Sequence, residues 1–185
     1  MRIFVGLEIP ASIKQHAGLL CGGVHGARWQ QPEQLHITLR FIGEVERPRL
    51  VDVDSALSRI HAPAFSVHLK GVDIFGEPNR PRLLWTGVEP AAPVQHLRDK
   101  VEAALTRAGL DAETRKFKPH LTLARFGREK PKRLADYLTS HHDFSSIDFP
   151  VNEFILFESR LGHTGSAYEP LARYELEEMR EAVGR

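Results

Sequence analysis

One short phrase occurs twice in this sequence of 185 residues and constrains the fold more than any other feature. The stretches "LHITLRFIGE" at 35–44 and "PHLTLARFGRE" at 119–129 each place a histidine two residues before a threonine inside an apolar run. Each stretch then reaches an Arg-Phe pair. A phrase repeated in this way predicts that the chain consists of two similar halves.

A second pair of similar stretches supports this repeat. "FVGLEIPA" at 4–11 and "WTGVEPAA" at 85–92 share an apolar run, a glycine, a glutamate and a proline. Proline cannot continue the hydrogen-bond ladder of a central strand, so each run should end there and lead into a helix. Ser12 is a candidate N-cap of the first such helix. The four helices expected from apolar spacing cover 11–20, 47–62, 93–109 and 130–140.

Strands complete each expected half. Besides the strands in the stretches above, we expect strands at 65–72, 81–88, 152–159 and 167–176. The order β-α-β-α-β-β, repeated, indicates an α+β protein with mostly antiparallel sheets. We expect one domain, 1–185, with a bilobal shape. Its two half-domains, about 1–80 and 81–178, would be related by a pseudo-twofold axis, with a central groove and the helices outside.

Composition places the chain among ordinary globular proteins. It has 42% hydrophobic and 26% charged residues, and its net charge of +1 argues neither for nor against an anionic partner. The one cysteine, Cys21, cannot form an internal disulfide, which fits a reducing compartment. The start, "MRIFVGLEIPASIKQH", does not resemble a signal peptide, and no stretch approaches the roughly 20 apolar residues of a membrane span. We therefore expect a cytoplasmic protein with no membrane partner.

The repeated phrase is also the candidate site. Successive side chains of a strand point to opposite faces, so residues i and i+2 share a face. His36 and Thr38 therefore share one face, and His120 and Thr122 share the equivalent face in the second half. A twofold relation between the halves would bring the two pairs together across the groove.

A structural explanation competes with a catalytic one. A single H-x-T on an amphipathic strand is common, and its histidine is usually a half-exposed strand residue without function. Duplication alone can also copy an inert strand. However, exposed polar positions should be the first to drift apart, and here the polar pair keeps its spacing in both halves. This favours catalysis.

The residue types suit in-line displacement at a phosphodiester. One imidazole can remove a proton from water while the other protonates the departing oxygen, since the ordinary histidine pKa is about 6.5. The hydroxyls of Thr38 and Thr122 can donate to the non-bridging oxygens, where negative charge accumulates. Arg125 can add a bidentate grip on phosphate, although a surface ion pair is its simpler explanation.

Neither a metal nor another cofactor is expected. The other histidines are isolated or lie in a polar stretch, and no H-E-x-x-H or paired aspartate motif appears. A metal-free mechanism is therefore the better interpretation.

Basic and aromatic residues near the two phrases suggest contacts with RNA. Lys118 and Arg128 belong to a basic cluster around the second phrase, which is either a solvated loop face or a track for an RNA backbone. Trp29, Phe41 and Phe126 are candidates for stacking a base, with core packing as the alternative for at least one of them.

At these residues the sequence resembles the two-histidine phosphoesterase superfamily. Within it, the chain is similar to the RNA 2',3'-cyclic phosphodiesterase family, also called the 2'-5' RNA ligase family. The paired H-x-T-x tetrapeptides are the superfamily's signature, and the resemblance covers about residues 1–178. It is also carried by "RIFVGLEIP", "RWQQPEQLHITLRFIGEV", "LLWTGVE", "FKPHLTLARF" and "FESRLGHTGSAYEPLARYEL".

The resemblance implies a role for each candidate. His36 matches the general acid and His120 the general base, while Thr38 and Thr122 match the hydroxyls that contact phosphate. Arg125 matches a basic residue that often follows the second motif. Arg40 lies where we expect a variable residue and is assigned no role.

The resemblance also implies the reaction. Such enzymes open a terminal 2',3'-cyclic phosphate on RNA to leave a 2'-phosphate, without metal. The ligase name describes the reverse reaction on substrates resembling tRNA halves. The implied partner is thus RNA with a cyclic-phosphate end, tRNA halves included, and the protein is expected to be a monomer.

Two other functions remain open at this point. One is a cyclic phosphodiesterase that acts on a small nucleotide, such as an ADP-ribose cyclic phosphate. The other is a module that binds the cyclic-phosphate end of RNA without turnover. The intact histidines in both motifs count against the second alternative.

Overall fold

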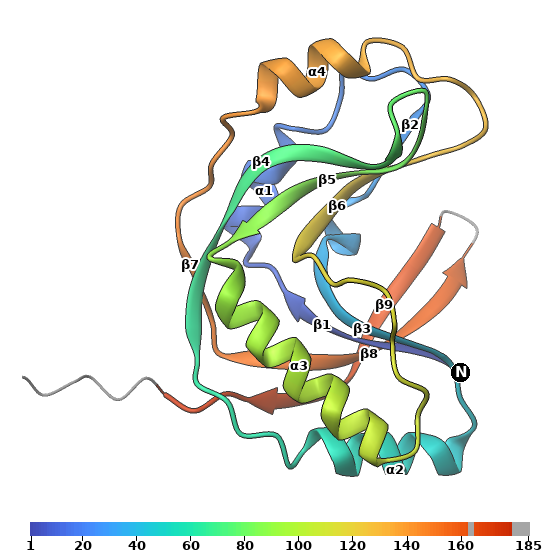
Figure 1. Ribbon diagram of the computed structural model, residues 1–185, viewed down its shortest axis with the longest axis vertical. Helices are drawn as coiled ribbons and strands as arrows, with labels where there is room; N and C mark the ends of the chain where they lie inside the picture. The colour runs from blue at the N-terminus through green and yellow to red at the C-terminus, as the bar shows by residue number, and fades with distance from the viewer. Residues whose placement is uncertain (163–164, 179–185) are drawn as a thin grey trace, which may run out of the picture.

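Within residues 1–162 and 165–178, which the computed structural model describes, four α-helices flank one curled nine-stranded sheet (Figure 1). The strands are β1 (Arg2–Glu8), β2 (Ala27–Trp29), β3 (His36–Glu44), β4 (Phe65–Glu77), β5 (Arg80–Glu89), β6 (His120–Phe126), β7 (Phe149–Val151), β8 (Glu153–Gly162) and β9 (Gly165–Glu175). The helices are α1 (Ala11–Gly18), α2 (Arg47–Leu57), α3 (Ala91–Arg107) and α4 (Leu134–His141), with a 3-10 turn η1 (Pro32–Gln34).

The sheet is antiparallel throughout the described strand pairs. Its order is β7-β4-β5-β6-β3-β1-β8-β9, with β2 pairing to β6 beside β3. The two motif strands, β3 and β6, are therefore neighbours at the centre, and four strands lie on the path to either side of their seam. The expected α+β class and antiparallel pairing are confirmed.

The two ends of the sheet each mix strands from both expected halves. Strand β4 ends at Glu77 and β5 begins at Arg80, and a connection this short places the two strands side by side as a hairpin. Strands β8 and β9, near the end of the chain, return to pair beside β1. The expected boundary near residue 80 therefore follows the sequence repeat and does not separate two units in space, because strands from before and after it alternate in one sheet.

The helices follow the expected order with shifted ends. Helix α2 stops at Leu57 and α4 starts only at Leu134, and the short strands β2 and β7 were not expected. Ser12 does not cap α1, because it lies inside the helix. The helix begins at Ala11, with Pro10 at the N-cap position and no side-chain cap. Among the described residues, none of the helices has the length and apolar character needed to cross a bilayer.

One continuous core holds both ends of the sheet together. It includes the inward residues of the motif strands, Ile37 and Leu121, which are fully buried. Helix α3 contributes one apolar face and packs against β3 and α2. The helical spacing predicts this face, whose buried residues include Val94, Leu97, Val101 and Leu105.

Two glycines at equivalent positions of the repeat allow close strand approach. A Cβ on Gly6 would lie 2.8 Å from the carbonyl oxygen of Ile37, on β3. A Cβ on Gly87 would lie 2.8 Å from the carbonyl oxygen of Lys70, on β4. Neither distance is compatible with a side-chain carbon unless a strand moves. The glycine shared by "FVGLE" and "WTGVE" is thus required by strand spacing.

Gly6→Ala and Gly87→Ala should each lower the free energy of unfolding by about 1–3 kcal/mol, the range typical of strained core substitutions. Urea denaturation of the purified variants measures this. Gly18→Ala is the matched control, because a Cβ there meets nothing within 4 Å and alanine favours a helix. Equal stability of the Gly6 variant and the Gly18 variant would contradict the close approach.

Candidate active site

The candidate site lies on the seam between β3 and β6. Ile37 is opposite Leu121 in the antiparallel register, which places His36 beside Thr122 and Thr38 beside His120. The histidines and threonines are half-buried on one face of the sheet, while the residues between them are buried on the other. The structure therefore brings the two H-x-T pairs together.

A β-bulge of the same kind follows both H-x-T pairs. On β3 the pairing with β1 steps from Thr38 to Arg40, so Leu39 is the extra residue. On β6 the pairing with β5 steps from Thr122 to Ala124, so Leu123 is the extra residue. A bulge reverses which face the following residues occupy.

The bulges explain why Phe41 and Arg125 belong to the site. Both lie an odd number of residues beyond their histidine, so strict alternation would turn them away from it. After the bulge they are exposed and line the same groove as His36. Five residues after its histidine, each motif strand therefore presents a side chain to the groove. This side chain is the aromatic ring of Phe41 on β3 and the cation of Arg125 on β6.

Each histidine is held by the backbone in the same way. His36 Nδ1 lies 2.7 Å from the carbonyl oxygen of Gln34, and His120 Nδ1 lies 2.7 Å from that of Lys118. A carbonyl oxygen only accepts, so Nδ1 carries the proton in both rings. Nε2 is then the nitrogen free for proton transfer, and His36 Nε2 accepts from the Thr38 hydroxyl at 2.9 Å.

Aromatic side chains enclose both imidazoles. The ring centroid of His36 lies 4.8 Å from Phe4 and 4.7 Å from Tyr168. That of His120 lies 4.9 Å from Phe75 and 5.9 Å from Trp85.

Sequence reasoning missed these four neighbours. The repeat contained a signal for two of them, because Phe4 and Trp85 each precede the shared glycine by two residues. No comparable pattern marks Phe75 or Tyr168, which reach the histidines from β4 and β9 through sheet pairing.

The site disfavours positive charge on its histidines. The pKa of His36 is lowered to about 4, chiefly because burial penalises the charged ring. The charges of Arg125, His120 and Lys14 lower it further, against the opposing effect of the bond to Gln34. The pKa of His120 is also lowered, first by burial and then by the charges of Lys118 and Arg125. Both rings are therefore neutral near pH 7 when no anion is bound.

A groove of about 480 Å³ opens on the His36 side. It brings together several expected site residues, namely Trp29, His36, Thr38, Phe41 and Arg125. Its other walls come from the N-terminal strand, the segment before β3 and the β8–β9 hairpin, and they are Arg2, Phe4, Arg28, Gln30, Gln34, Ser159, Gly165, Ser166 and Tyr168.

The remaining predicted RNA contacts differ in position. Lys118 lies beside His120, with its ammonium 4.6 Å from the centre of the Trp85 ring. Phe126 is buried in the core and is not free to stack a base. Arg128 is exposed beyond β6 and is not among the residues that line the groove, so its role stays a prediction.

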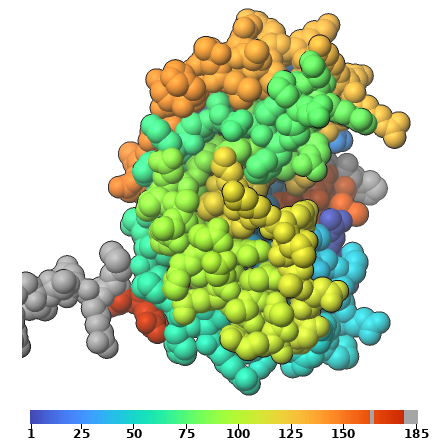
Figure 2. Space-filling view, viewed as in Figure 1, coloured from blue at the N-terminus to red at the C-terminus, as the bar shows by residue number. Residues whose placement is uncertain are grey.

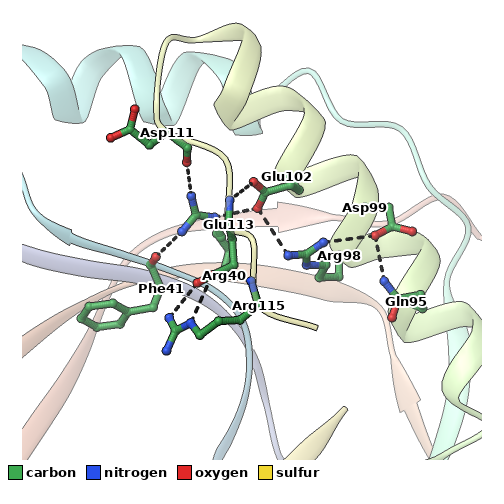
Figure 3. A network of polar contacts seen from close by, with 9 residues as sticks. All are labelled: Arg40, Phe41, Gln95, Arg98, Asp99, Glu102, Asp111, Glu113 and Arg115. Carbon is green, nitrogen blue, oxygen red and sulfur yellow. Dashed lines mark hydrogen bonds and ion pairs between the residues drawn. The ribbon is translucent and has the colours of Figure 1, made fainter. Parts of the chain in front are cut away.

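A network around Arg40 fixes the segment that leads to His120 (Figure 3). Arg40 Nε contacts Glu102 Oε2 at 2.6 Å, and its other nitrogens donate to the carbonyl oxygens of Phe41 and Asp111. Glu102 Oε1 accepts from the backbone N–H of Glu113 at 2.8 Å.

This network gives Arg40 a structural role that sequence reasoning did not assign. The side chains of Arg40 and Glu102 are only 10% and 15% exposed, so losing one partner would leave a largely buried charge. The segment they hold runs between α3 and β6 and crosses the centre of the face seen in Figure 2. It carries Lys118, whose carbonyl fixes the tautomer of His120.

Comparison with known proteins agrees with this geometry. The sequence profile of the 2'-5' RNA ligase superfamily matches residues 15–163. The chain is 32% identical to the RNA 2',3'-cyclic phosphodiesterase of Archaeoglobus fulgidus over 178 residues, covering 95% of this chain and 100% of the relative. It is 36% identical to the protein of the same name from Aeropyrum pernix over 143 residues, covering 76% and 81%.

Solved structures show the same fold. A protein of Thermus thermophilus matches with a TM-score of 0.80 and 25% identity, covering 97% of this chain and 100% of that one. E. coli LigT in complex with 3'-AMP matches with a TM-score of 0.75 and 26% identity, covering 95% and 97%. By sequence profile, by curated relatives and by fold, the chain belongs to the 2'-5' RNA ligase superfamily.

Proposed function

We propose that this chain hydrolyses the 2',3'-cyclic phosphate at the end of an RNA, leaving a 2'-phosphomonoester. The observation that carries the proposal is the pairing of two H-x-T units across one seam, each with its Nδ1 tied to a carbonyl. With Nδ1 bound in both rings, Nε2 is the nitrogen through which each histidine would act, and the proposal assigns both Nε2 atoms to a single phosphorus. One base and one acid are what in-line hydrolysis requires.

In the proposed reaction, His120 Nε2 takes a proton from water as the water oxygen bonds to phosphorus. The bond between phosphorus and O3' breaks on the opposite side, and O3' receives a proton from His36 Nε2. Thr38, Thr122 and Arg125 hold the non-bridging oxygens, where negative charge grows. The two histidines exchange protonation states in the reaction, and solvent restores them.

The negative charge of the substrate favours the protonated form of His36, which the acid role requires. In the free site both pKa values are lowered, so a protonated His36 is scarce near pH 7. A bound phosphate anion favours the imidazolium form and offsets the cations that oppose it. Protonation of the acid is thus coupled to substrate binding.

The relatives described above favour RNA over the alternatives. Those from Archaeoglobus fulgidus and Aeropyrum pernix both carry the name RNA 2',3'-cyclic phosphodiesterase, which favours RNA over an ADP-ribose cyclic phosphate. The two intact H-x-T units favour turnover over a module that only binds RNA ends. The proposal extends to reverse 2'-5' ligation, to tRNA halves as substrates and to a cytoplasmic monomer. The monomer is supported by the placement of both H-x-T units on neighbouring strands of one chain.

His36→Ala and His120→Ala should each lower kcat by about 10²–10⁴-fold, the usual loss when a general acid or base is removed. The double variant should lose much less than the product of the two losses, because the histidines act as a unit. Turnover of an oligonucleotide with a 2',3'-cyclic phosphate end measures this. His96→Ala, exposed on α3, is the matched control. Near-normal turnover by either single variant would remove the mechanism.

A substrate whose leaving group departs without protonation separates the two roles. On it, His36→Ala should matter little and His120→Ala should remain severe. If both variants are equally damaged on this substrate, the assignment of His36 as the acid is wrong.

The pH dependence of kcat/KM, which reports on the free enzyme, should be bell-shaped with both limbs below the ordinary histidine value of 6.5. The kcat profile should lie at higher pH, since bound phosphate favours imidazolium. Arg125→Gln removes a positive charge that lowers the pKa of both histidines, so its kcat/KM profile should move to higher pH. Arg107→Gln, exposed at the end of α3, should leave the profile in place. An unmoved profile in the Arg125 variant would contradict this electrostatic account.

Activity on the cyclic phosphate should survive treatment with a chelator, because protein cations and hydroxyls take the role of a metal in this mechanism. Among the described residues, no group of three or more His, Cys, Asp or Glu side chains is placed to hold a metal ion. The assay compares turnover before and after EDTA treatment. Loss of activity that a divalent ion restores would move the protein to another mechanistic class.

A further inference from the structure

Two arginines lie directly opposite each other in the groove. Arg28 on β2 pairs with Arg125 on β6 in the antiparallel register, and both are exposed and line the groove. Like charges directly opposite on neighbouring strands are destabilising. Within residues 1–162 and 165–178, neither guanidinium forms an ion pair with a carboxylate. An anion bound between Arg28 and Arg125 would therefore relieve the repulsion between their guanidinium groups.

The two arginines differ in their distance from the reacting phosphate. Arg125 lowers the pKa of both histidines, whereas Arg28 is not among the charges that act on either one. The pair lies three residues beyond Thr122 along β6, and because one of the three is the bulge residue Leu123, the separation is below the roughly 10 Å of a regular strand. The charge of Arg125 reaches both histidines, while Arg28 lies opposite Arg125 on β2, in the same groove.

We propose that Arg28 forms a second anion subsite, which binds the phosphate on the 5' oxygen of the terminal nucleotide. This rests on the proposed function. In RNA that phosphate is the diester linking the last nucleotide to the rest of the chain, so the subsite selects an RNA end over a bare nucleoside 2',3'-cyclic phosphate. Arginine suits this task because its planar fork binds phosphate oxygens in pairs.

The groove between the two anion sites has the character of a nucleoside site. Trp29, Phe41 and Tyr168 line it beside the arginines, and aromatic rings are the usual platform for a base. The arrangement also has a direction. The ribose lies on the side of the departing O3', opposite the attacking water, and the groove opens on the side of His36, the proposed acid.

No equivalent subsite exists on the other half among the described residues. β2 precedes β3, but the segment that precedes β6 contains no strand and is held instead by Arg40 and Glu102. The position that corresponds to Arg28, 84 residues further along, is Ala112. A single extra subsite matches a substrate with a nucleoside on one side of the phosphorus and water on the other.

The test compares two substrates that differ by one group, adenosine 2',3'-cyclic phosphate and its 5'-phosphorylated form, at one pH and ionic strength. For the native protein the 5'-phosphate should raise kcat/KM about tenfold or more, mainly through KM, as expected for a charge-assisted contact remote from the reaction. Arg28→Gln should abolish this gain, so that the variant gives the same kcat/KM on both substrates. Arg107→Gln, exposed on α3 and outside the groove, should keep the gain.

Binding of the products separates this proposal from the proposed function. Calorimetry with adenosine 2'-monophosphate and adenosine 2',5'-bisphosphate should show the same preference for the 5'-phosphate, lost in Arg28→Gln, whether or not turnover occurs. The variant should unfold at no lower urea concentration than the native protein, because it removes a repulsion. A native protein indifferent to the 5'-phosphate, or an Arg28 variant that keeps the preference, overturns the subsite.

Discussion

Ile37 on β3 and Leu121 on β6 face each other at the one described register pair between the two motif strands, and the site depends on this contact. Both side chains are fully buried, so the register is fixed from the core side of the sheet. A slip of one residue would turn these leucine and isoleucine side chains into the groove and the histidines into the core. The hydrophobic core therefore holds the two catalytic candidates in place without contacting the substrate.

The electrostatics of the site follow from the same placement. Aromatic rings and burial make each imidazole poor at holding a proton, and nearby cations add to the effect. A site that repels positive charge when free and is lined by arginine and lysine is prepared for an anion. In each motif the histidine Nδ1 is bound to the carbonyl two residues earlier, of Gln34 or of Lys118. These two hydrogen bonds determine that Nε2 is the nitrogen that takes part in proton transfer.

Much of this site could be predicted from the sequence, because it rests on local rules. The alternation of a strand places His36 with Thr38 and His120 with Thr122, and the repeat indicates that the pairs meet. The same alternation would turn Arg125 away from the groove, because it lies an odd number of residues after His120. Only the bulge at Leu123 returns it to the groove, and a bulge depends on pairing with β5.

Other features could not be predicted because they depend on distant partners. The role of Arg40 requires Glu102 and the carbonyl of Asp111, which lie far from it in the sequence and are brought to it by the packing of α3 on β3. Strand β2 has three residues, too few for a pattern, and its position follows from pairing with β6. Tyr168 reaches His36 because β9 is added at the far edge of the sheet, beyond β8.

Because strands from before and after residue 80 alternate in the sheet, neither part of the chain can complete the site alone. A half cut at the β4–β5 connection would keep β1 and β3 but lose their neighbours β6 and β8, leaving both edges of a two-stranded ribbon unpaired. It would also hold only one of the two motif histidines, His36, with no second imidazole to act from the far side of a phosphorus. A chain of that length could therefore bring two motif histidines together only by pairing with a second copy, whose strands would have to take the places that β6 and β8 hold here.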